Sequence, residues 1–307
     1  MRRTPFFGTV SDTEIRSMRI FVKIVECGGL SAAQSELGIE RSTISRQLSN
    51  LETRFGLRLC HRGRSGFHLT QHGEQAHGHI QRFLSAADEL SNQIAGISDR
   101  LDGQLDIGLM DYTFCNPRNP LLNIITDFRN RAPNVVINLS VGSPRDIGRK
   151  VVDGLLHIGV MVSDDVLPEL ESQILFQEVG GLFAGGNHPI ANKVRSGEKV
   201  TENDVYDHQV IFRGYRETSL QNSIKSKFQR GPVILETEAV EALICSGSYL
   251  GFLPINVGMV NSDLRVEVLP EIFRNNFPVR LLRRRNRRLS PVLREFLNVL
   301  GAGMARD

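Results

Sequence analysis

The spacing of the apolar residues changes at Asp102-Gly103, and this change limits the possible folds more than any other feature. Before it, apolar residues mostly recur every three or four positions, as on helices. Beyond it, segments in which apolar and polar residues alternate, as in strands, are interspersed with segments of helical spacing. This order predicts an α/β fold with a mostly parallel sheet. The expected strands are 105–109, 135–139, 158–162, 210–212, 233–235, 249–253 and 279–282, and the expected helices cover 121–128, the segment from 144, 219–228, 239–245 and 291–300.

Three short helices and a hairpin are predicted within the first 70 residues. The first helical pattern ends at Gly28-Gly29. Ser31 then offers an N-cap for a short helix over 32–37, and a third helix follows over 41–55. Alternating residues on both sides of the basic tip at 62–66 indicate a β-hairpin. Helix, turn, helix and basic hairpin in this order are the layout of a winged helix-turn-helix.

The third of these helices has an apolar face and a polar face. Ile44, Leu48, Leu51 and Phe55 recur at helical spacing and would pack on the first two helices. On the other face, hydroxyl groups suit phosphates, while arginine and glutamine can hydrogen-bond guanine or adenine in the major groove. A merely solvated polar face is the alternative for one helix alone, but the hairpin favours duplex DNA. The candidate DNA-binding residues are Ser31, Arg41, Ser42, Thr43, Ser45, Arg46, Gln47, Asn50, Arg62 and Arg64.

Charge is distributed unevenly along the chain, whose formal net charge is +3. Residues 1–64 hold 11 Lys/Arg and 6 Asp/Glu, and residues 280–307 hold 8 Arg and 2 acidic residues, so the region between them is acidic. A basic end suggests contact with an anionic polymer, with random scatter of charge as the alternative. The dense run Arg283–Arg288 is either a second nucleic-acid contact or, as we expect, a solvated loop.

A long helix is expected from Thr70 to about Leu101. Its apolar residues are spaced by threes and fours, close to a heptad seam, and form one narrow stripe. A single helix of this length cannot bury such a stripe, so we expect it to pair with a second copy of the chain; packing within its own chain is the alternative. The stripe consists of Ile80, Phe83 or Leu84, Ala87, Leu90, Ile94, Ile97 and Leu101.

Several classes of protein are disfavoured by what the sequence lacks. It has no apolar stretch of about 18 residues for a membrane span, and no apolar segment follows the basic N-terminus as in a secretory signal. Cys27, Cys60, Cys115 and Cys245 lie far apart without a CxxC pair, which favours reduced thiols in the cytoplasm. The sequence shows neither a catalytic constellation nor a phosphate-binding loop. We therefore expect no cofactor, no metal site and no enzymatic activity.

Several motifs between residues 14 and 75 resemble the N-terminal domain of LysR-type transcriptional regulators. They are Ser31-Ala32-Ala33-Gln34-Ser35-Glu36-Leu37-Gly38, Ser42-Thr43-Ile44-Ser45-Arg46-Gln47-Leu48, Leu51-Glu52, Phe55-Gly56, Leu59, Arg62 and Leu69-Thr70-Gln71-His72-Gly73. The rest of the chain matches in length and layout. Gly29-Leu30, Arg41 and Cys60 depart from the family's usual residues, and Arg41 changes the expected base preference because it starts the recognition helix.

The resemblance implies a homodimer joined through the long linker helix, often assembled into a homotetramer, that binds double-stranded promoter DNA. It also implies a C-terminal domain of two α/β lobes, similar to periplasmic solute-binding proteins, with a small-molecule effector between the lobes. The expected domains are a tail (1–13), a winged helix-turn-helix (14–72), a linker helix (73–101) and an effector domain (102–307). The chain is thus expected to be a cytoplasmic, sequence-specific transcriptional regulator. A solute-binding module without DNA binding and an enzyme of α/β fold are the alternatives.

The residues expected to contact the effector lie in loops at strand ends and helix N-termini. Ser143 before Pro144 is the strongest candidate, because an N-cap hydroxyl and free backbone N–H groups would face an anion. Arg213 could hold a carboxylate, whereas Asp111 would repel one unless the ligand also carries an amino group. We therefore expect an organic acid or an amino-acid-like effector. The candidate residues are Asp111, Thr113, Ser143, Pro144, Ser163, Phe212, Arg213 and Glu238.

Overall fold

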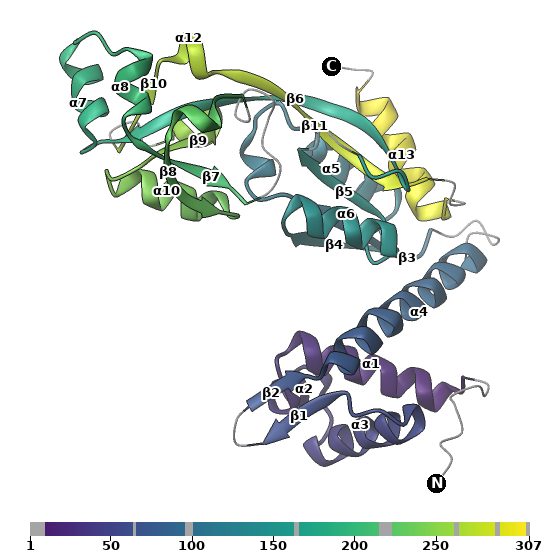
Figure 1. The fold of residues 1–307 in the computed structure, drawn as a ribbon. Coiled ribbons are helices and arrows are strands. Elements are labelled where there is room, and N and C mark those ends of the chain that lie inside the picture. The colour runs from purple at the N-terminus through teal and green to yellow at the C-terminus, as the bar shows by residue number, and fades with distance from the viewer. Residues whose placement is uncertain are drawn as a thin grey trace. The chain divides into compact units, whose positions relative to one another are not determined.

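The computed structural model describes residues 10–63, 66–95, 101–162, 166–214, 223–260, 264–285 and 289–304. Its contacts divide the chain into two compact units, Met1–Ser91 and Asn92–Asp307, which we call the head and the effector domain (Figure 1). Arg64, Ser163 and Ile97, which were singled out in the sequence, lie outside the described residues, as do 219–222 of a predicted helix and 286–288 of the arginine run.

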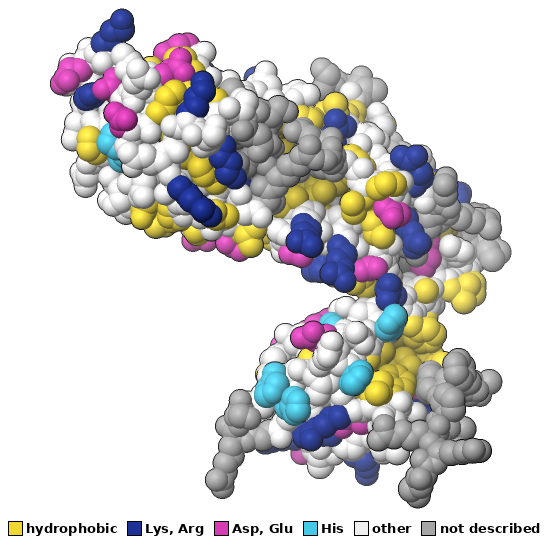
Figure 2. All heavy atoms as spheres, viewed as in Figure 1, with side chains coloured by type: hydrophobic (Ala, Val, Ile, Leu, Met, Phe, Trp, Pro, Cys, Tyr) yellow, Lys and Arg dark blue, Asp and Glu magenta, His cyan; other side chains and the backbone are white. Residues whose placement is uncertain are grey.

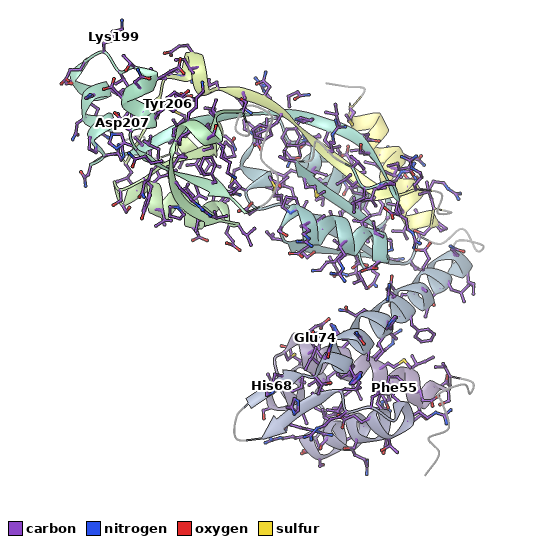
Figure 3. All side chains as sticks on the ribbon, viewed as in Figure 1. Phe55, His68, Glu74, Lys199, Tyr206 and Asp207 are labelled. Atoms are coloured by element: carbon purple, nitrogen blue, oxygen red, sulfur yellow. The ribbon has the colours of Figure 1, made fainter. Side chains whose placement is uncertain are left out.

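The head consists of helices and one two-stranded hairpin, which we call the wing (Figure 1). Its elements are α1 (Asp12–Glu26), α2 (Leu30–Leu37), α3 (Arg41–Phe55), β1 (Cys60–Gly63), β2 (Gly66–Leu69) and α4 (Gln71–Ala95). The two strands of the wing pair antiparallel, with His61 opposite His68 (Figure 3). The three predicted helices and the predicted hairpin are therefore confirmed.

The start of α2 differs from the prediction. Gly28 and Gly29 adopt φ angles of 71° and 153°, which residues with a side chain rarely adopt, and the chain turns there. This turn brings Leu30 into the head core, so the helix opens at Leu30 with Gly29 in the N-cap position. Ser31 lies one residue inside the helix, and its expected role as the N-cap is wrong.

The head core joins the apolar faces of α1, α2 and α3 to the wing and to α4. Ile44, Leu48 and Leu51 are buried as predicted, and Phe55 is partly buried at the end of the same face (Figure 3). A Cβ added to Gly73 would lie only 1.8 Å from the carbonyl oxygen of Leu59, so glycine allows α4 to begin directly against the wing.

The apolar residues of α4 serve two different purposes. Ile80 and Leu84 are buried in the head core, so the prediction that Ile80 faces a second chain is wrong. Leu101 lies beyond the described part of α4 and packs against the core of the effector domain, so it does not belong to the stripe either. Figure 2 shows hydrophobic side chains at the surface where α4 runs. Among the described side chains of this helix, the exposed large apolar ones are Phe83, Leu90 and Ile94, at 39%, 58% and 58% exposure.

The described residues of the effector domain contain one nine-stranded sheet. The strand order is β4-β3-β5-β11-β6-β9-β7-β8, and β10 pairs with β6 beside this path. The strands are β3 (Gly103–Leu109), β4 (Val135–Val141), β5 (Ile158–Val162), β6 (Leu170–Gly185), β7 (Gln209–Arg213), β8 (Gln229–Ile234), β9 (Leu250–Pro254), β10 (Arg265–Val268) and β11 (Asn275–Arg284).

Two lobes share this sheet and are connected by the long strands β6 and β11, which pair antiparallel (Figure 1). Lobe one contains the parallel strands β3, β4 and β5, and lobe two contains the parallel strands β7, β8 and β9. The predicted parallel pairing is therefore right within each lobe and wrong for the connecting strands. The helices are α5 (Leu121–Arg131), α6 (Pro144–Asp153) and α13 (Pro291–Met304) in lobe one, and α7 (Pro189–Ser196), α8 (Glu202–Tyr206), α10 (Thr237–Cys245), α11 (Ile255–Gly258) and α12 (Pro270–Phe273) in lobe two.

Some elements of the effector domain were not predicted, among them β6, β10 and the short helices α7, α8 and α12. β6 is 16 residues long, and its burial changes from half-exposed at the lobe-one end to buried on both faces at the lobe-two end, so it has no single apolar period. Of the predicted helix over 219–228, residues 219–222 lie outside the described residues, residues 223 and 224 are helical, and Lys225–Lys227 follow as a short 3-10 helix. Among the described helices, none is both long and apolar enough to cross a membrane.

Candidate nucleic-acid interface and effector site

The face of α3 opposite the head core is polar and open to solvent. Arg41, Ser42, Arg46 and Asn50 are exposed on it, because Ile44 and Leu48 direct the other face inward. Thr43 and Ser45 are half-buried at its margins. Two guanidinium groups, a hydroxyl and an amide on one helix face can contact phosphates and base edges in a major groove.

Gln47 is turned toward α1 and away from this face. The hydroxyl of Ser17, a buried residue of α1, donates a hydrogen bond of 2.6 Å to the side-chain oxygen of Gln47. A bidentate contact with adenine needs both the oxygen and the nitrogen of the amide directed at the base. Ser17 thus already occupies one acceptor position of the Gln47 amide in this arrangement.

Arg62 connects the wing to α3 instead of standing at the hairpin tip as expected. It lies opposite Phe67 inside the hairpin ladder. Its guanidinium donates to the carboxylate of Glu52 at 2.6 Å, to the hydroxyl of Ser45 at 3.2 Å and to that of Ser49 at 3.1 Å. The guanidinium of Arg62 is thus already paired within the head.

Glu52 is the centre of this connection. Its second carboxylate oxygen accepts hydrogen bonds from the backbone N–H groups of Leu59, at 2.9 Å, and Cys60, at 3.4 Å. One acidic side chain on α3 therefore binds both the first residues of the wing and its arginine. This fixes the position of the wing relative to α3, and hence which groups both elements can present to one DNA duplex.

The two lobes of the effector domain meet where the loop after β3 faces the start of α10. The carboxylate of Asp111, in lobe one, accepts a hydrogen bond from the backbone N–H of Thr237, the first residue of α10 in lobe two. Arg213, at the end of β7, lies 3.7 Å from the same carboxylate and donates to the Thr237 hydroxyl at 2.7 Å. Both a helix N-terminus and a guanidinium stabilise negative charge.

Tyr112 makes a second contact between the lobes. Its hydroxyl donates to Glu241 of α10 at 3.2 Å, and Glu241 also pairs with the buried guanidinium of Arg265. Burial, followed by the negative charge of Glu241, raises the pKa of Tyr112, so the hydroxyl keeps its proton. The φ angle of Tyr112 is +57°, a left-handed conformation that costs a residue with a side chain about 1–3 kcal/mol.

The loop that carries Asp111 and Tyr112 is anchored at its other end. The buried amide of Asn116 donates to the carboxylate of Glu178 on β6 at 3.1 Å, and Asn119 donates to the carbonyl of Thr113 at 2.8 Å. Burial raises the pKa of Glu178. The anchored part of the loop thus belongs to lobe one and to the connecting strand.

The predicted N-cap at Ser143 is confirmed. Its side chain accepts a hydrogen bond from the backbone N–H of Asp146 at 3.2 Å, and Pro144 is the first residue of α6. The hydroxyl also donates to the Asp146 carboxylate at 2.7 Å. Because the hydroxyl is already used and Asp146 places a negative charge in the first turn, this helix start attracts an anion less than expected.

The remaining candidate residues have different surroundings. Thr113 is buried, and its hydroxyl donates to the carbonyl of Met110 in the same loop. Phe212 is buried in the core of lobe two, where it packs against Phe228. Glu238 is exposed on the first turn of α10. Thr113 and Phe212 therefore support the loop and the lobe core, and this placement does not support their expected contact with a ligand.

The described part of the arginine run lies at the end of a strand. Arg283, in β11, pairs with Glu171 of β6 at 2.7 Å, and residues 286–288 lie outside the described residues.

Comparison with known proteins agrees with both parts of this geometry. Residues 15–74 match the family described as bacterial regulatory helix-turn-helix protein, lysR family, and residues 98–305 match the LysR substrate binding domain. The chain belongs to the LysR family of transcriptional regulators. Its N-terminal domain is a DNA-binding helix-turn-helix, and its C-terminal domain binds an effector. The family comprises transcriptional regulators rather than enzymes, and the solute-binding module without DNA binding is discarded.

Two relatives and two solved structures illustrate the similarity. The regulator is 31% identical over 300 residues to the HTH-type transcriptional activator BauR of Pseudomonas aeruginosa, covering 97% of this chain and 98% of that protein. It is 23% identical over 279 residues to a probable RuBisCO transcriptional regulator of Thalassiosira pseudonana, covering 86% and 88%. The fold resembles CbnR, with a TM-score of 0.65 at 17% identity over 95% and 99% of the chains, and full-length CbnR complexed with its target DNA, with a TM-score of 0.64 at 18% identity over 94% and 99%.

Several residues of the regulator that shape these sites were not among the candidates. Glu52 is the one acidic residue between Arg41 and Arg64, a signal that could have suggested an internal partner for an arginine. Glu241 falls on the helix predicted over 239–245 and Thr237 lies two residues before it, but their partners lie more than 100 residues away in sequence. Arg265 lies on a strand that was not predicted.

Proposed function

We propose that the effector of this regulator is a small organic acid or an amino-acid-like molecule that binds between the lobes at the N-terminus of α10. One observation carries this proposal: a carboxylate, that of Asp111, already lies there against the Thr237 N–H, with the Arg213 guanidinium nearby. A free carboxylate would find the same hydrogen-bond donor and the same positive charge.

The acidic residues around this position favour a ligand that also carries an amino group. Asp111, Glu238 and Glu241 all lie close to Tyr112, since Glu241 accepts its hydroxyl and the charge of Glu238 also contributes to its raised pKa. An ammonium group beside these carboxylates would be stabilised by charge, while the ligand carboxylate would pair with Arg213. Ser143 and Pro144 remain candidates on the lobe-one side.

The proposal includes a homodimer formed through α4, and two such dimers would form a homotetramer. The exposed residues Phe83, Leu90 and Ile94, together with the half-buried Ala87, follow one another at intervals of four, three and four residues. This is the spacing of a heptad seam, which buries its apolar side chains against a second helix. The dimer would present two copies of α3 to promoter DNA in the cytoplasm.

The proposed mechanism is linkage between the two ligands. An effector that binds one arrangement of the lobes better than another shifts the population toward that arrangement. If the arrangement of the lobes alters the spacing of the two heads in the dimer, effector and DNA change each other's affinity by the same factor. Arg46, at the centre of the exposed face of α3, would then read a base edge, while Arg41 and Ser42 would bind phosphates.

Calorimetric titration of the full-length protein tests the ligand class. Acetate, propionate and succinate serve as simple acids, and glycine and alanine as amino acids with matching carbon chains. We expect at least one of these five to bind, and Arg213→Ala to abolish that binding. Arg149→Ala, which removes an exposed positive charge near the C-terminal end of α6, should leave it unchanged. Binding of cationic or wholly apolar compounds while every carboxylate failed would overturn the proposal.

A further inference from the structure

We propose that Asp111 is an internal ligand that occupies the effector position and holds the two lobes together until an acid displaces it. Its carboxylate is the group that caps α10 from outside, since the residue in the N-cap position, Glu236, makes no side-chain capping bond. The cap therefore comes from the opposite lobe, 126 residues away in sequence.

The contacts of Asp111 are those that a free carboxylate would make. Thr237 is buried, with 3% exposure, and the Arg213 side chain has 10% exposure, so both are shielded from water where they meet the carboxylate. A carboxylate tethered in this way competes with free acids at a high effective concentration. The site can therefore bind a free acid only by releasing Asp111, and release removes the cap between the lobes.

The local backbone makes Asp111 and Tyr112 the releasable part of their loop. Tyr112 holds a left-handed φ of +57°, and its hydroxyl bond to Glu241 is a second contact with the same helix. By contrast, Asn116 and Asn119 bind within lobe one or to β6. A rotation limited to Asp111 and Tyr112 would therefore free both contacts with α10 and relieve the left-handed conformation, while the anchored part of the loop stays in place.

This inference rests on the proposed acid effector for the displacing ligand, but the contact between the lobes can be tested without any ligand. Hydrogen–deuterium exchange of the α10 amides is measured in the full-length wild type, in Asp111→Asn and in Asp111→Ala. We expect exchange at Thr237 to be slowest in the wild type and fastest in Asp111→Ala, because alanine removes the acceptor entirely. Asp127→Asn, which removes an exposed carboxylate of α5, should exchange like the wild type. Equal exchange at α10 in all four proteins would overturn the internal cap.

Titration of acetate, propionate, succinate, glycine and alanine into the same four proteins tests the displacement. We expect Asp111→Asn to bind the acid about tenfold more tightly than the wild type, within the range typical of coupling between sites. Asp127→Asn should bind like the wild type. If the wild type binds an acid and Asp111→Asn binds it no more tightly, the proposal that Asp111 is an internal ligand is contradicted, whereas the proposed effector class is supported. If exchange changes as expected but no acid binds to any of the four proteins, displacement by an acid and the proposed ligand class fall together.

Discussion

Arg62 in the wing donates a hydrogen bond of 2.6 Å to Glu52 of α3, so this arginine holds the wing against the recognition helix. The same carboxylate accepts the N–H groups of Leu59 and Cys60. The positive charge of Arg62 is thus balanced within the head before any DNA arrives, which changes what its removal should do.

We expect Arg62→Ala to lower the stability of the head and to leave the salt dependence of DNA binding nearly unchanged. Loss of the hydrogen bonds to Glu52 should lower the free energy of unfolding by about 1 kcal/mol, measured by urea denaturation. The slope of log affinity against log salt reports phosphate contacts and should stay at the wild-type value. In the matched variant Arg41→Ala, whose side chain is exposed on α3, the slope should fall by about 1. A reduced slope in Arg62→Ala would show that Arg62 contacts a phosphate.

Arg46→Ala should weaken binding to the specific site and relax the preference for a base. The side chain is exposed at the centre of the polar face of α3. Loss of a contact with a base edge is expected to reduce the free energy of specific binding by roughly 1–3 kcal/mol, measured by gel shift on the specific site and on its single-base variants. Arg118→Ala in the effector domain is the charge-matched control. If Arg46→Ala discriminated between sites like the wild type, another residue would read the base.

Ile94→Asp should shift the protein from dimer toward monomer. Ile94 is 58% exposed in the single chain, so the change does not disturb the head core, but in a paired helix it would bury an unpaired charge. Light scattering of the full-length protein measures the change in mass. Gln75→Asp, at an exposed polar position of the same helix, should remain dimeric. Ile80→Asp should instead unfold the head, because Ile80 lies in its core. An unchanged oligomer in Ile94→Asp would exclude the stripe as the interface.

His188 should make the stability of the effector domain depend on pH. It is the N-cap of α7, where its Nδ1 accepts the N–H of Ile190 at 3.2 Å. Burial and the neighbouring ring of His208 lower the pKa of His188 to about 4.

In the unfolded chain, the ring takes up a proton near its ordinary pKa of about 6.5, so unfolding binds protons between the two values. The contribution of His188 to the free energy of unfolding is thus fully present above about pH 6.5. It decreases by on the order of 2–3 kcal/mol as the pH falls toward 4. His188→Asn keeps a capping acceptor that does not titrate, so denaturation across this range should show a smaller pH dependence. An equal dependence in both proteins would contradict the assignment.

How much the sequence could predict depends on the range of each interaction. The apolar spacing of Ile44, Leu48 and Leu51 predicted α3, since a helix with one buried face shows this period wherever it lies. Ser143 and Pro144 predicted the start of α6 because the cap uses residues that are neighbours in sequence. Local rules of this kind account for most of the head.

The errors come from contacts between distant residues. The pairing of Arg62 with Glu52 was not predicted because the two residues lie on different elements, and the start of α2 differs because Leu30 is buried in the core. The contact of Asp111 with Thr237 joins residues 126 positions apart, and neither a period nor a motif marks such a pair. β6 was not predicted because the burial of its side chains changes along its length, as it passes from one lobe to the other.

Footprinting of the full-length protein on the promoter next to its own gene tests the central claim most directly, namely that an acid bound between the lobes changes how the regulator binds DNA. The footprint is recorded with and without the acid that binds best in calorimetry, for the wild type and for Arg213→Ala. We predict a specific footprint that the acid shortens, extends or weakens in the wild type and leaves unchanged in Arg213→Ala. A wild-type footprint that is the same with and without a saturating concentration of the bound acid would contradict the account.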